Sequence, residues 1–396
     1  PPSVLLALSA SEDASVQRRL DRNPGTPALA LCSLYGGGRR STLVSLIAQH
    51  PHTPAAILEG IAEQDRDEVS LKAVCLNPAA TTRALLAIDE RMPGRFDCEL
   101  AANQATPAEL LERLYARGDG GMRAAVIAHE SCPAGLLELA ASDQDVHVLR
   151  QLARKAGQDA GLLARLARHA DVGVRRNAAG NAGIARNDLV ALASDESSSV
   201  RRVVAAREDL PLPQMKLLAQ DEDHWVRQWL ARNPALPVRL LARLAADAEG
   251  EVRRAVARNP NCPVRLLKQL AEDVDAWVRS AVAYQPKASA HLLKRLELNN
   301  EVDVLSGVAS NPHTPQKILQ KLVQSQETDV RRGVILNRRA KRKTLLPLLQ
   351  DPYYLHRLLL VSNDSLNEKD KWGLHDDPDH SVRFAVYKWF SARLRQ

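Results

Sequence analysis

Apolar residues recur along this chain in blocks that repeat with a fixed period. Residues 226–247 read VRQWLARNPALPVRLLARLAAD and residues 252–273 read VRRAVARNPNCPVRLLKQLAED, so the same pattern returns after 26 residues. In each block a short amphipathic segment ends at Asn-Pro, because the residue before proline avoids the helical region and proline lacks an N–H donor. A second proline, such as Pro237 or Pro263, stands where a longer helix would take its first residue. Each block therefore predicts a short helix, a turn and a longer helix.

The period extends over nearly the whole chain. We take the residue at the Asn of Asn-Pro as the anchor of each block; the first two steps between anchors are 27 residues and every later step is 26. The fourteen anchors are Asn23, His50, Asn77, Asn103, His129, Lys155, Asn181, Arg207, Asn233, Asn259, Gln285, Asn311, Asn337 and Asn363. One helix pair cannot bury its apolar face alone, whereas stacked pairs can. The sequence therefore predicts an all-α superhelical solenoid of about fourteen 26-residue two-helix repeats.

The repeated unit N-P-x-x-P-x-x-L-L-x-x-L-A-x-D…V-R-x-x-V-A resembles the leucine-rich repeat variant family and, less closely, HEAT repeats. The resemblance covers roughly residues 16–389 and implies a right-handed superhelix of alternating longer and shorter helices. One member of that family carries an iron–sulfur cluster on a Cys-rich N-terminal segment, but this sequence has no cysteine cluster, so we expect no such cofactor. We expect a single solenoid over 1–396, with an N-terminal cap at about 1–22, repeats at about 23–362 and a C-terminal cap at about 363–396.

The composition agrees with closely packed helices. Apolar residues make up 45% of the chain but aromatic residues only 4%, which disfavours a β-sandwich. No apolar run approaches the roughly 18 residues that a membrane-spanning helix needs, so we expect no membrane association. The five cysteines are odd in number and widely spaced, which favours free thiols, a reducing compartment and a cytoplasmic location.

Two charged positions recur in register with the anchor. An Asp stands twelve residues before many anchors and an Arg stands six residues before many of them. The aspartates are Asp65, Asp143, Asp195, Asp221, Asp247, Asp273, Asp351 and Asp377, and the arginines are Arg123, Arg175, Arg201, Arg227, Arg253, Arg279, Arg331, Arg357 and Arg383. We interpret them as a structural ladder in which each Asp accepts hydrogen bonds from an Arg of its own or the next repeat. The anchors themselves are interpreted as turn and ladder formers rather than ligands.

A second set of arginines recurs less regularly and supplies the candidate binding residues. These arginines stand five residues before the anchor or immediately before it, two positions that share a helix face. They are Arg150, Arg154, Arg176, Arg202, Arg232, Arg254, Arg258 and Arg332. Residues 225–345 hold 22 Lys+Arg and 11 Asp+Glu, a net charge of +11. The row predicts contact with an anionic partner, either nucleic acid or an acidic protein, and the alternative is a solvated surface without a partner.

Three tryptophans support an alternative function. Trp225 and Trp277 share a register, and Trp229 occupies a position that is Ala or Gly in several other repeats. HEAT-like alkylpurine DNA glycosylases resemble this chain in being basic helical solenoids with Trp and Asp at the reaction centre. The comparable group here is Trp225, Trp229 and Asp221 or Asp223, since catching a damaged base needs aromatic faces and a carboxylate. We favour the structural interpretation, in which these indoles pack in the core or at a corner.

Established catalytic motifs are absent from the sequence: it contains no G-x-S-x-G, P-loop, dinucleotide fingerprint or H-E-x-x-H. The segment 375–380 is dense in His and Asp but overlaps a predicted turn, so we expect no metal there. The basic run 337–343 is either a loop that contacts nucleic acid or a degraded turn. We therefore predict a non-enzymatic scaffold without metal or cofactor, whose partner is protein or nucleic acid. The alternatives are a DNA glycosylase and a protein adaptor that ignores charge.

Overall fold

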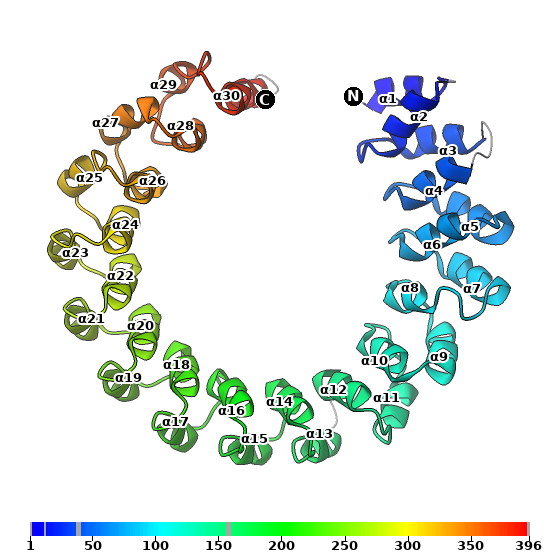
Figure 1. Ribbon diagram of the computed structural model, residues 1–396, viewed down its shortest axis with the longest axis horizontal. Coiled ribbons are helices and arrows are strands. Elements are labelled where there is room, and N and C mark those ends of the chain that lie inside the picture. Colours follow the sequence, from blue (N-terminus) through cyan, green and yellow to red (C-terminus); the bar gives the residue numbers. More distant parts are fainter. Residues whose placement is uncertain (1, 12, 37–40, 156–159, 394–396) are drawn as a thin grey trace. The chain divides into compact units, whose positions relative to one another are not determined.

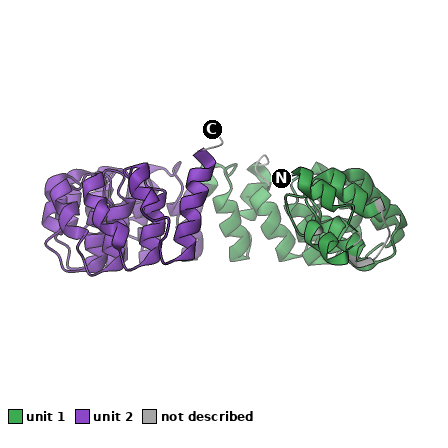
Figure 2. Ribbon diagram, turned by 90° about the horizontal axis from the view of Figure 1, so that it is seen from above, with its two compact units in different colours: residues 1–188 green, residues 189–396 purple. Residues whose placement is uncertain are grey.

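The computed structural model describes residues 2–11, 13–36, 41–155 and 160–393. Every regular element within these ranges is a helix. The chain divides into two compact units, Pro1–Asp188 and Leu189–Gln396 (Figure 2), and the division falls inside helix α15 (Arg186–Leu192). The predicted all-α solenoid architecture is confirmed, while the prediction that the repeats form a single domain stays a prediction.

The first unit consists of helix pairs that match the sequence repeats. Its helices are α1 (Pro2–Leu8), α2 (Ala14–Asp21), α3 (Ala28–Gly36), α4 (Ser41–Gln49), α5 (Ala55–Gln64), α6 (Glu68–Leu76), α7 (Thr82–Arg91), α8 (Asp97–Ala102), α9 (Ala108–Arg117), α10 (Gly120–Ala128), α11 (Ala134–Ala140), α12 (Val146–Lys155), α13 (Ala160–Leu166) and α14 (Val172–Gly180). The helix that ends at the anchor is called here the first helix of its repeat, and the helix after the turn is the second. The first helices α4, α6, α8, α10, α12 and α14 pack on one another in one layer (Figure 1). The second helices form the other layer.

The second unit repeats the same two-layer arrangement. Its helices are α16 (Ser198–Ala205), α17 (Leu212–Leu218), α18 (His224–Arg232), α19 (Val238–Leu244), α20 (Gly250–Arg258), α21 (Val264–Leu270), α22 (Ala276–Tyr284), α23 (Ala290–Leu296), α24 (Val302–Ser310), α25 (Gln316–Leu322), α26 (Thr328–Leu336), α27 (Arg342–Leu345), the 3-10 helix η1 (Leu346–Gln350), α28 (Tyr354–Val361), α29 (Glu368–Trp372) and α30 (His380–Arg393). The first helices α16, α18, α20, α22, α24 and α26 pack side by side in one layer (Figure 1).

The relative helix lengths in the second unit differ from the prediction. The first helices α18, α20 and α22 have nine residues each, and the second helices α19, α21 and α23 have seven. The reason lies at the helix ends. Asp223 caps α18 ten residues before the anchor and thereby adds a turn that the apolar pattern does not reveal. The second helix α19 ends at Leu244, one turn short of the ladder position Asp247.

The core lies between the two helix layers. Val252 and Val256 of α20 are fully buried, as are Leu241 and Leu244 of α19. Successive first helices approach closely where a small residue stands four positions before the anchor. At Gly307 a Cβ atom would lie 2.7 Å from the Cβ of a neighbouring alanine on α22, so a larger side chain would force the helices apart.

The anchor residues tie each repeat to the preceding one. The Nδ2 group of Asn259 donates to the backbone carbonyls of Ala231 (2.7 Å) and Asn233 (2.9 Å), and its Oδ1 accepts from the backbone N–H of Asn261 at 2.8 Å. Histidine performs the same task at His129, whose Nε2 lies 2.9 Å from the carbonyl of Asn103. The interpretation of the anchors as ladder formers is confirmed.

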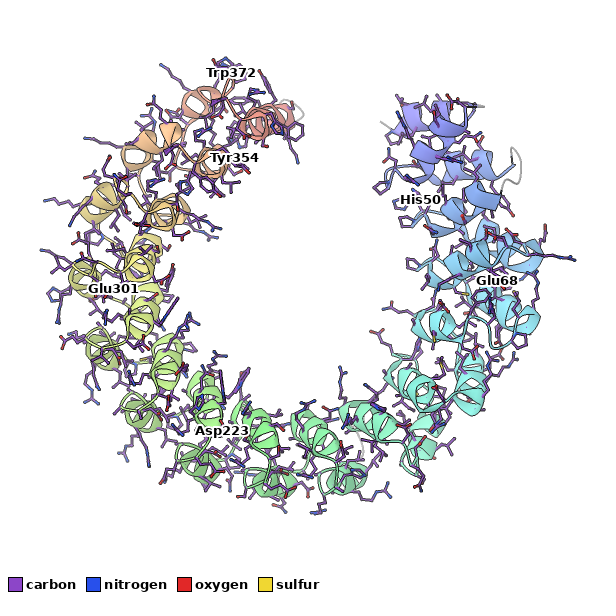
Figure 3. All side chains as sticks on the ribbon, viewed as in Figure 1. His50, Glu68, Asp223, Glu301, Tyr354 and Trp372 are labelled. Carbon is purple, nitrogen blue, oxygen red and sulfur yellow. The ribbon has the colours of Figure 1, made fainter. Side chains whose placement is uncertain are left out.

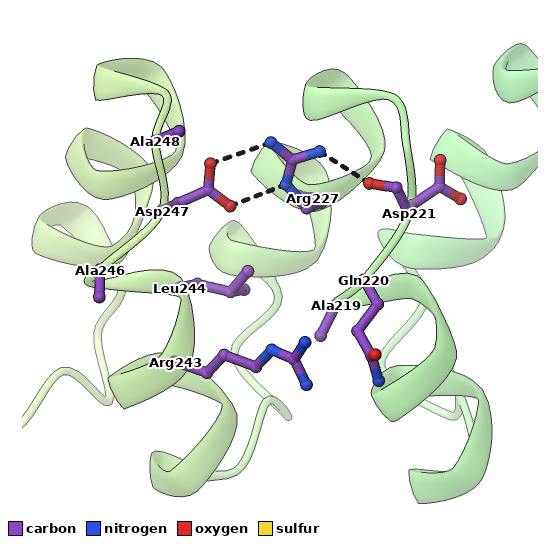
Figure 4. Close-up of a pocket in the computed structure, with 9 residues that line it drawn as sticks. All are labelled: Ala219, Gln220, Asp221, Arg227, Arg243, Leu244, Ala246, Asp247 and Ala248. Carbon is purple, nitrogen blue, oxygen red and sulfur yellow. Dashed lines mark hydrogen bonds and ion pairs between the residues drawn. The ribbon is translucent and has the colours of Figure 1, made fainter.

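The Asp–Arg ladder also joins neighbouring repeats. Arg227 donates from Nε and Nη2 to Asp247 of the next repeat at 2.7 and 2.9 Å, and from Nη1 to the backbone carbonyl of Asp221 at 2.7 Å (Figure 4). The same Arg-to-next-Asp pairing links Arg123–Asp143, Arg201–Asp221, Arg253–Asp273, Arg331–Asp351 and Arg357–Asp377. Each guanidinium therefore neutralises one carboxylate and satisfies a loop carbonyl, which confirms the structural interpretation.

All five cysteines are free thiols. Burial raises the pKa of the Cys75 thiol to about 12 and that of Cys262 to about 11, so neither is an activated nucleophile at neutral pH. Within the described ranges, no helix has both the length and the apolar character that crossing a bilayer requires.

Candidate partner-binding site on the second unit

The eight arginines of the predicted row are divided between the two units. The first unit carries Arg150 and Arg154 on α12 and Arg176 on α14, and the second carries Arg202 on α16, Arg232 on α18, Arg254 and Arg258 on α20, and Arg332 on α26. Arg154, Arg176, Arg232, Arg258 and Arg332 are exposed, and the other three are partly buried. Four arginines of the second unit are of greatest interest, because tryptophans lie on the same surface. These arginines are Arg202, Arg232, Arg254 and Arg258.

Two arginines of the row belong to a second set of ion pairs, which the sequence analysis did not anticipate. Arg150 pairs with Asp171 through two hydrogen bonds of 2.9 and 2.7 Å. Arg202 donates to Asp223 at 2.8 Å. Each carboxylate also caps the first helix of the next repeat. These two arginines lie outside the Asp–Arg ladder, but each reaches the carboxylate that caps the first helix of the next repeat.

The Asp223 cap carries a negative charge that its neighbours stabilise. Asp223, labelled in Figure 3, accepts from the backbone N–H of Trp225 at 2.7 Å. Burial acts to raise the pKa of this carboxyl, but hydrogen bonds from Ser198, Arg202 and that N–H outweigh it and hold the pKa well below its usual range. Asp223 is consequently a charged structural cap at neutral pH.

Arg232, Arg254 and Arg258 differ, because the described residues provide no ion-pair partner for any of them. Arg254 and Arg258 stand one turn apart on α20, and α20 packs against α18, which carries Arg232. Partial desolvation, together with the like charges of Arg254 and Arg232, lowers the pKa of Arg258. The Nε of Arg254 is buried and has no hydrogen-bond partner within the described structure. Helices α18 and α20 therefore present a cluster of positive charge with which no carboxylate of the described chain forms an ion pair.

The three tryptophans lie at this cluster and are not core residues. Trp225, Trp229 and Trp277 are 43, 40 and 53% exposed. Cation–π contacts hold an arginine over each: the Cζ of Arg202 lies 5.9 Å from the ring centroid of Trp225, that of Arg232 lies 5.2 Å from Trp229, and that of Arg254 lies 5.0 Å from Trp277. Packing in the core, one of the two predicted arrangements, is therefore wrong for these indoles.

Helical spacing explains why these groups share one surface. On α18, residues 225, 229 and 232 follow i, i+4, i+7 spacing and stand on one side, while Val226 and Leu230 are buried on the other. On α22, Trp277 and Tyr284 have the same i, i+7 relation. We call the surface formed by Arg202, Trp225, Trp229, Arg232, Arg254, Arg258, Trp277 and Tyr284 the aromatic–arginine face. It runs over α16, α18, α20 and α22, which are adjacent in one layer (Figure 1).

The carboxylates proposed for a glycosylase-like centre are both occupied. Asp221 accepts two hydrogen bonds from Arg201, at 2.7 and 2.9 Å, as part of the ladder. Asp223 pairs with Arg202, as described above. The exposed indoles are therefore accompanied here by carboxylates that already neutralise arginines.

Some residues of the remaining candidate segments have structural roles. In the basic run 337–343, Asn337 keeps the anchor hydrogen bonds to the carbonyls of Ala309 and Asn311, and Arg342 forms a two-bond ion pair with Asp370 (2.6 and 2.7 Å). In the segment 375–380, Asp377 belongs to the ladder. The described part of the chain contains no group of three or more His, Cys, Asp or Glu side chains arranged to hold a metal ion.

Comparison with known protein families finds a match in two adjacent repeats. The family described as leucine rich repeat variant matches residues 224–249 and 250–275. These two repeats, residues 224–275, match the leucine-rich repeat variant family. The resemblance noted in the sequence is confirmed there, and the two repeats carry five residues of the aromatic–arginine face, namely Trp225, Trp229, Arg232, Arg254 and Arg258.

Other comparisons add little. A search of curated proteins finds no match. Among solved structures, the chain is similar to a crystal structure of an engineered protein that is 17% identical. The match covers 98% of this chain and 97% of that one, with a TM-score of 0.23.

Proposed function

We propose that this protein is a non-enzymatic repeat scaffold that binds an anionic macromolecule through the aromatic–arginine face. The observation that carries the proposal is the cluster of Arg232, Arg254 and Arg258, which lacks carboxylate partners among the described residues. Like charges held close together cost free energy, and an anionic partner would recover it. The ladder arginines, by contrast, are each matched by an acceptor from their own chain, such as Asp247 for Arg227.

The exposed indoles also favour this surface as the binding site. Tryptophan is rare in this chain, with five in 396 residues, yet three stand on this face at 40% exposure or more. Exposed tryptophan beside arginine is typical of binding surfaces, where both residue types supply a large share of the binding energy. A surface that only needed to stay hydrated would gain nothing from these indoles.

The test compares two triple variants that change the net charge equally. The site variant carries Arg232→Ala, Arg254→Ala and Arg258→Ala. The control variant carries Arg239→Ala, Arg243→Ala and Arg265→Ala, which removes exposed arginines from the second helices α19 and α21. Binding is measured by fluorescence anisotropy with labelled single-stranded DNA, duplex DNA and polyglutamate over a series of salt concentrations.

We expect wild-type protein to bind at least one probe, with an affinity that falls as salt rises. The site variant should lose roughly tenfold or more in affinity, and the control variant much less. The melting temperature of the site variant should not fall, because its substitutions remove unpaired like charges. Absence of binding to all three probes at low salt would refute the proposal, and so would equal losses in the two variants.

A further inference from the structure

We propose that the anionic partner is a single-stranded nucleic acid, whose bases stack on Trp225, Trp229 and Trp277 while its phosphates bind Arg232 and Arg258. This inference rests on the function proposed above and specifies its partner. It follows from the way aromatic and cationic groups alternate on the face from one repeat to the next.

The alternation is visible on three adjacent helices. On α18 the order is Trp225, Trp229 and Arg232, with Arg232 stacked on Trp229. On α20 the corresponding side presents Arg254 and Arg258. On α22 it presents Trp277, which lies under Arg254, followed by Tyr284. The arginines of α20 thus lie between the two tryptophans of α18 and the single tryptophan of α22, which places phosphate-binding and base-stacking groups on neighbouring helices.

Single-stranded nucleic acid fits this combination better than the other anionic partners. Its bases expose flat π faces that stack on aromatic side chains, and each such contact contributes about 1–3 kcal/mol. A duplex keeps its bases stacked inside, so the indoles would meet only sugar and phosphate. An acidic polypeptide would neutralise the arginines but offers no regular series of flat groups to the indoles.

The repeat geometry suits a flexible strand. Neighbouring helices of one layer pack about 8–10 Å apart, so the stacking and charged groups recur at the spacing of the helices. A single strand can adjust its backbone to such a spacing, and helical repeat proteins that take one base per repeat are known. The phosphates of a duplex are fixed by its helical geometry instead.

One acidic residue interrupts the face and provides a sensitive test. Glu251 on α20 occupies the register of Trp225 and Trp277, eight residues before its anchor, and is exposed. Its carboxylate would repel a phosphate backbone lying along the face. Glu251→Gln should therefore tighten binding about two- to fivefold, which corresponds to about 0.4–1 kcal/mol.

The decisive experiment needs no variant. It compares an oligo-dT strand with an abasic strand of the same length and phosphate number, using wild-type protein at one salt concentration. Stacking predicts that the abasic strand binds at least about tenfold more weakly, because the charge is unchanged and only the bases are lost. Binding of oligo-dT should also quench tryptophan fluorescence, and the abasic strand should quench it much less.

Two variants locate the contact. Trp229→Leu and Trp277→Leu should each weaken oligo-dT binding about five- to tenfold while leaving polyglutamate binding unchanged. Trp372→Leu is the matched control, since Trp372 is 45% exposed but lies on α29, away from the face. Melting curves of all three variants exclude unfolding as the cause.

The outcomes separate this inference from the function on which it rests. Equal affinity for oligo-dT and the abasic strand refutes base stacking, even if the arginine variant still loses binding. Tighter binding of the duplex, or of polyglutamate, refutes the single-stranded partner and leaves the anionic scaffold standing. If no anionic probe binds, the proposed function itself fails.

Discussion

Arg201 and Arg202 are neighbours in sequence, yet they meet different carboxylates of the next repeat. Arg201 pairs with the ladder residue Asp221, and Arg202 pairs with the helix cap Asp223. Arg254 has the register of Arg202 but makes no ion pair with any described residue, and it lies over Trp277 instead. At the scale of single residues, the function proposed here depends on this difference between paired and unpaired arginines.

Asp351 provides a test of the ladder at the same scale. This carboxyl accepts from Arg331 at 2.6 and 3.3 Å, and His356 Nδ1 lies 3.0 Å from it. Burial acts to raise its pKa, but the hydrogen bonds from Arg331 and the Tyr353 N–H, together with the nearby His356 ring, lower it from 3.8 to about 2. Because the folded pKa is depressed, this contribution to stability is present above about pH 4 and is lost as the pH falls toward 2.

The expected size is about 2 kcal/mol, from a pKa shift of nearly two units. Urea unfolding at pH 6 and pH 2.5 measures it in wild type and in Asp351→Asn. The wild type should lose more stability on acidification than the variant, because the variant has no carboxyl at this position to protonate. Equal losses would show that the Asp351 carboxylate does not contribute as the ladder requires.

At the scale of the repeat element, the anchor hydrogen bonds can be tested by replacing the asparagine of one anchor with histidine, the residue that another anchor uses. Asn259→Ala leaves two carbonyls of the preceding repeat without their donor in a buried position, which should cost about 2–3 kcal/mol. Asn259→His should cost clearly less, because His129 already bonds the carbonyl of Asn103 through Nε2 and accepts the Ser131 N–H through Nδ1. Denaturant midpoints of the two variants give the comparison, and equal destabilisation would contradict the interchangeability of the two residue types.

The repeat element is also where the sequence was most informative. The 26-residue period, the turn at Asn-Pro and the spacing of ladder residues such as Arg227 and Asp247 are all visible without a structure, because a repeated contact leaves a repeated residue. The pairing of Arg202 with Asp223 is also indicated in the sequence, by an Asp ten residues before several anchors. That signal shows a helix cap, but which arginine reaches it depends on the offset between neighbouring helices.

The site was less predictable than the fold. The sequence placed the arginines of the candidate face correctly on first helices, but it could not tell which of them had partners. It also could not decide where Trp229 lies, because a tryptophan in a register of small residues can either replace core volume or protrude. The 40% exposure of Trp229 and its contact with Arg232 settle this point in favour of protrusion.

At the scale of the whole molecule, charge is concentrated in one part of the chain. Residues 225–345 carry a net +11 and the remainder a net −4. The aromatic–arginine face lies largely within this basic region, in the second unit. A long-range positive field would draw an anionic chain toward the repeats that carry the stacking groups and would raise the rate of association at low salt.

Hydroxyl-radical footprinting of the tryptophans, with and without oligo-dT, tests the central claim most directly. All the indoles are read in one experiment, and Trp372 serves as an internal control of similar exposure. If the aromatic–arginine face is the binding surface, oxidation of Trp225, Trp229 and Trp277 falls severalfold on binding while oxidation of Trp372 does not change. Unchanged oxidation of the three indoles in a saturated complex, or protection of Trp372 alone, would contradict the account.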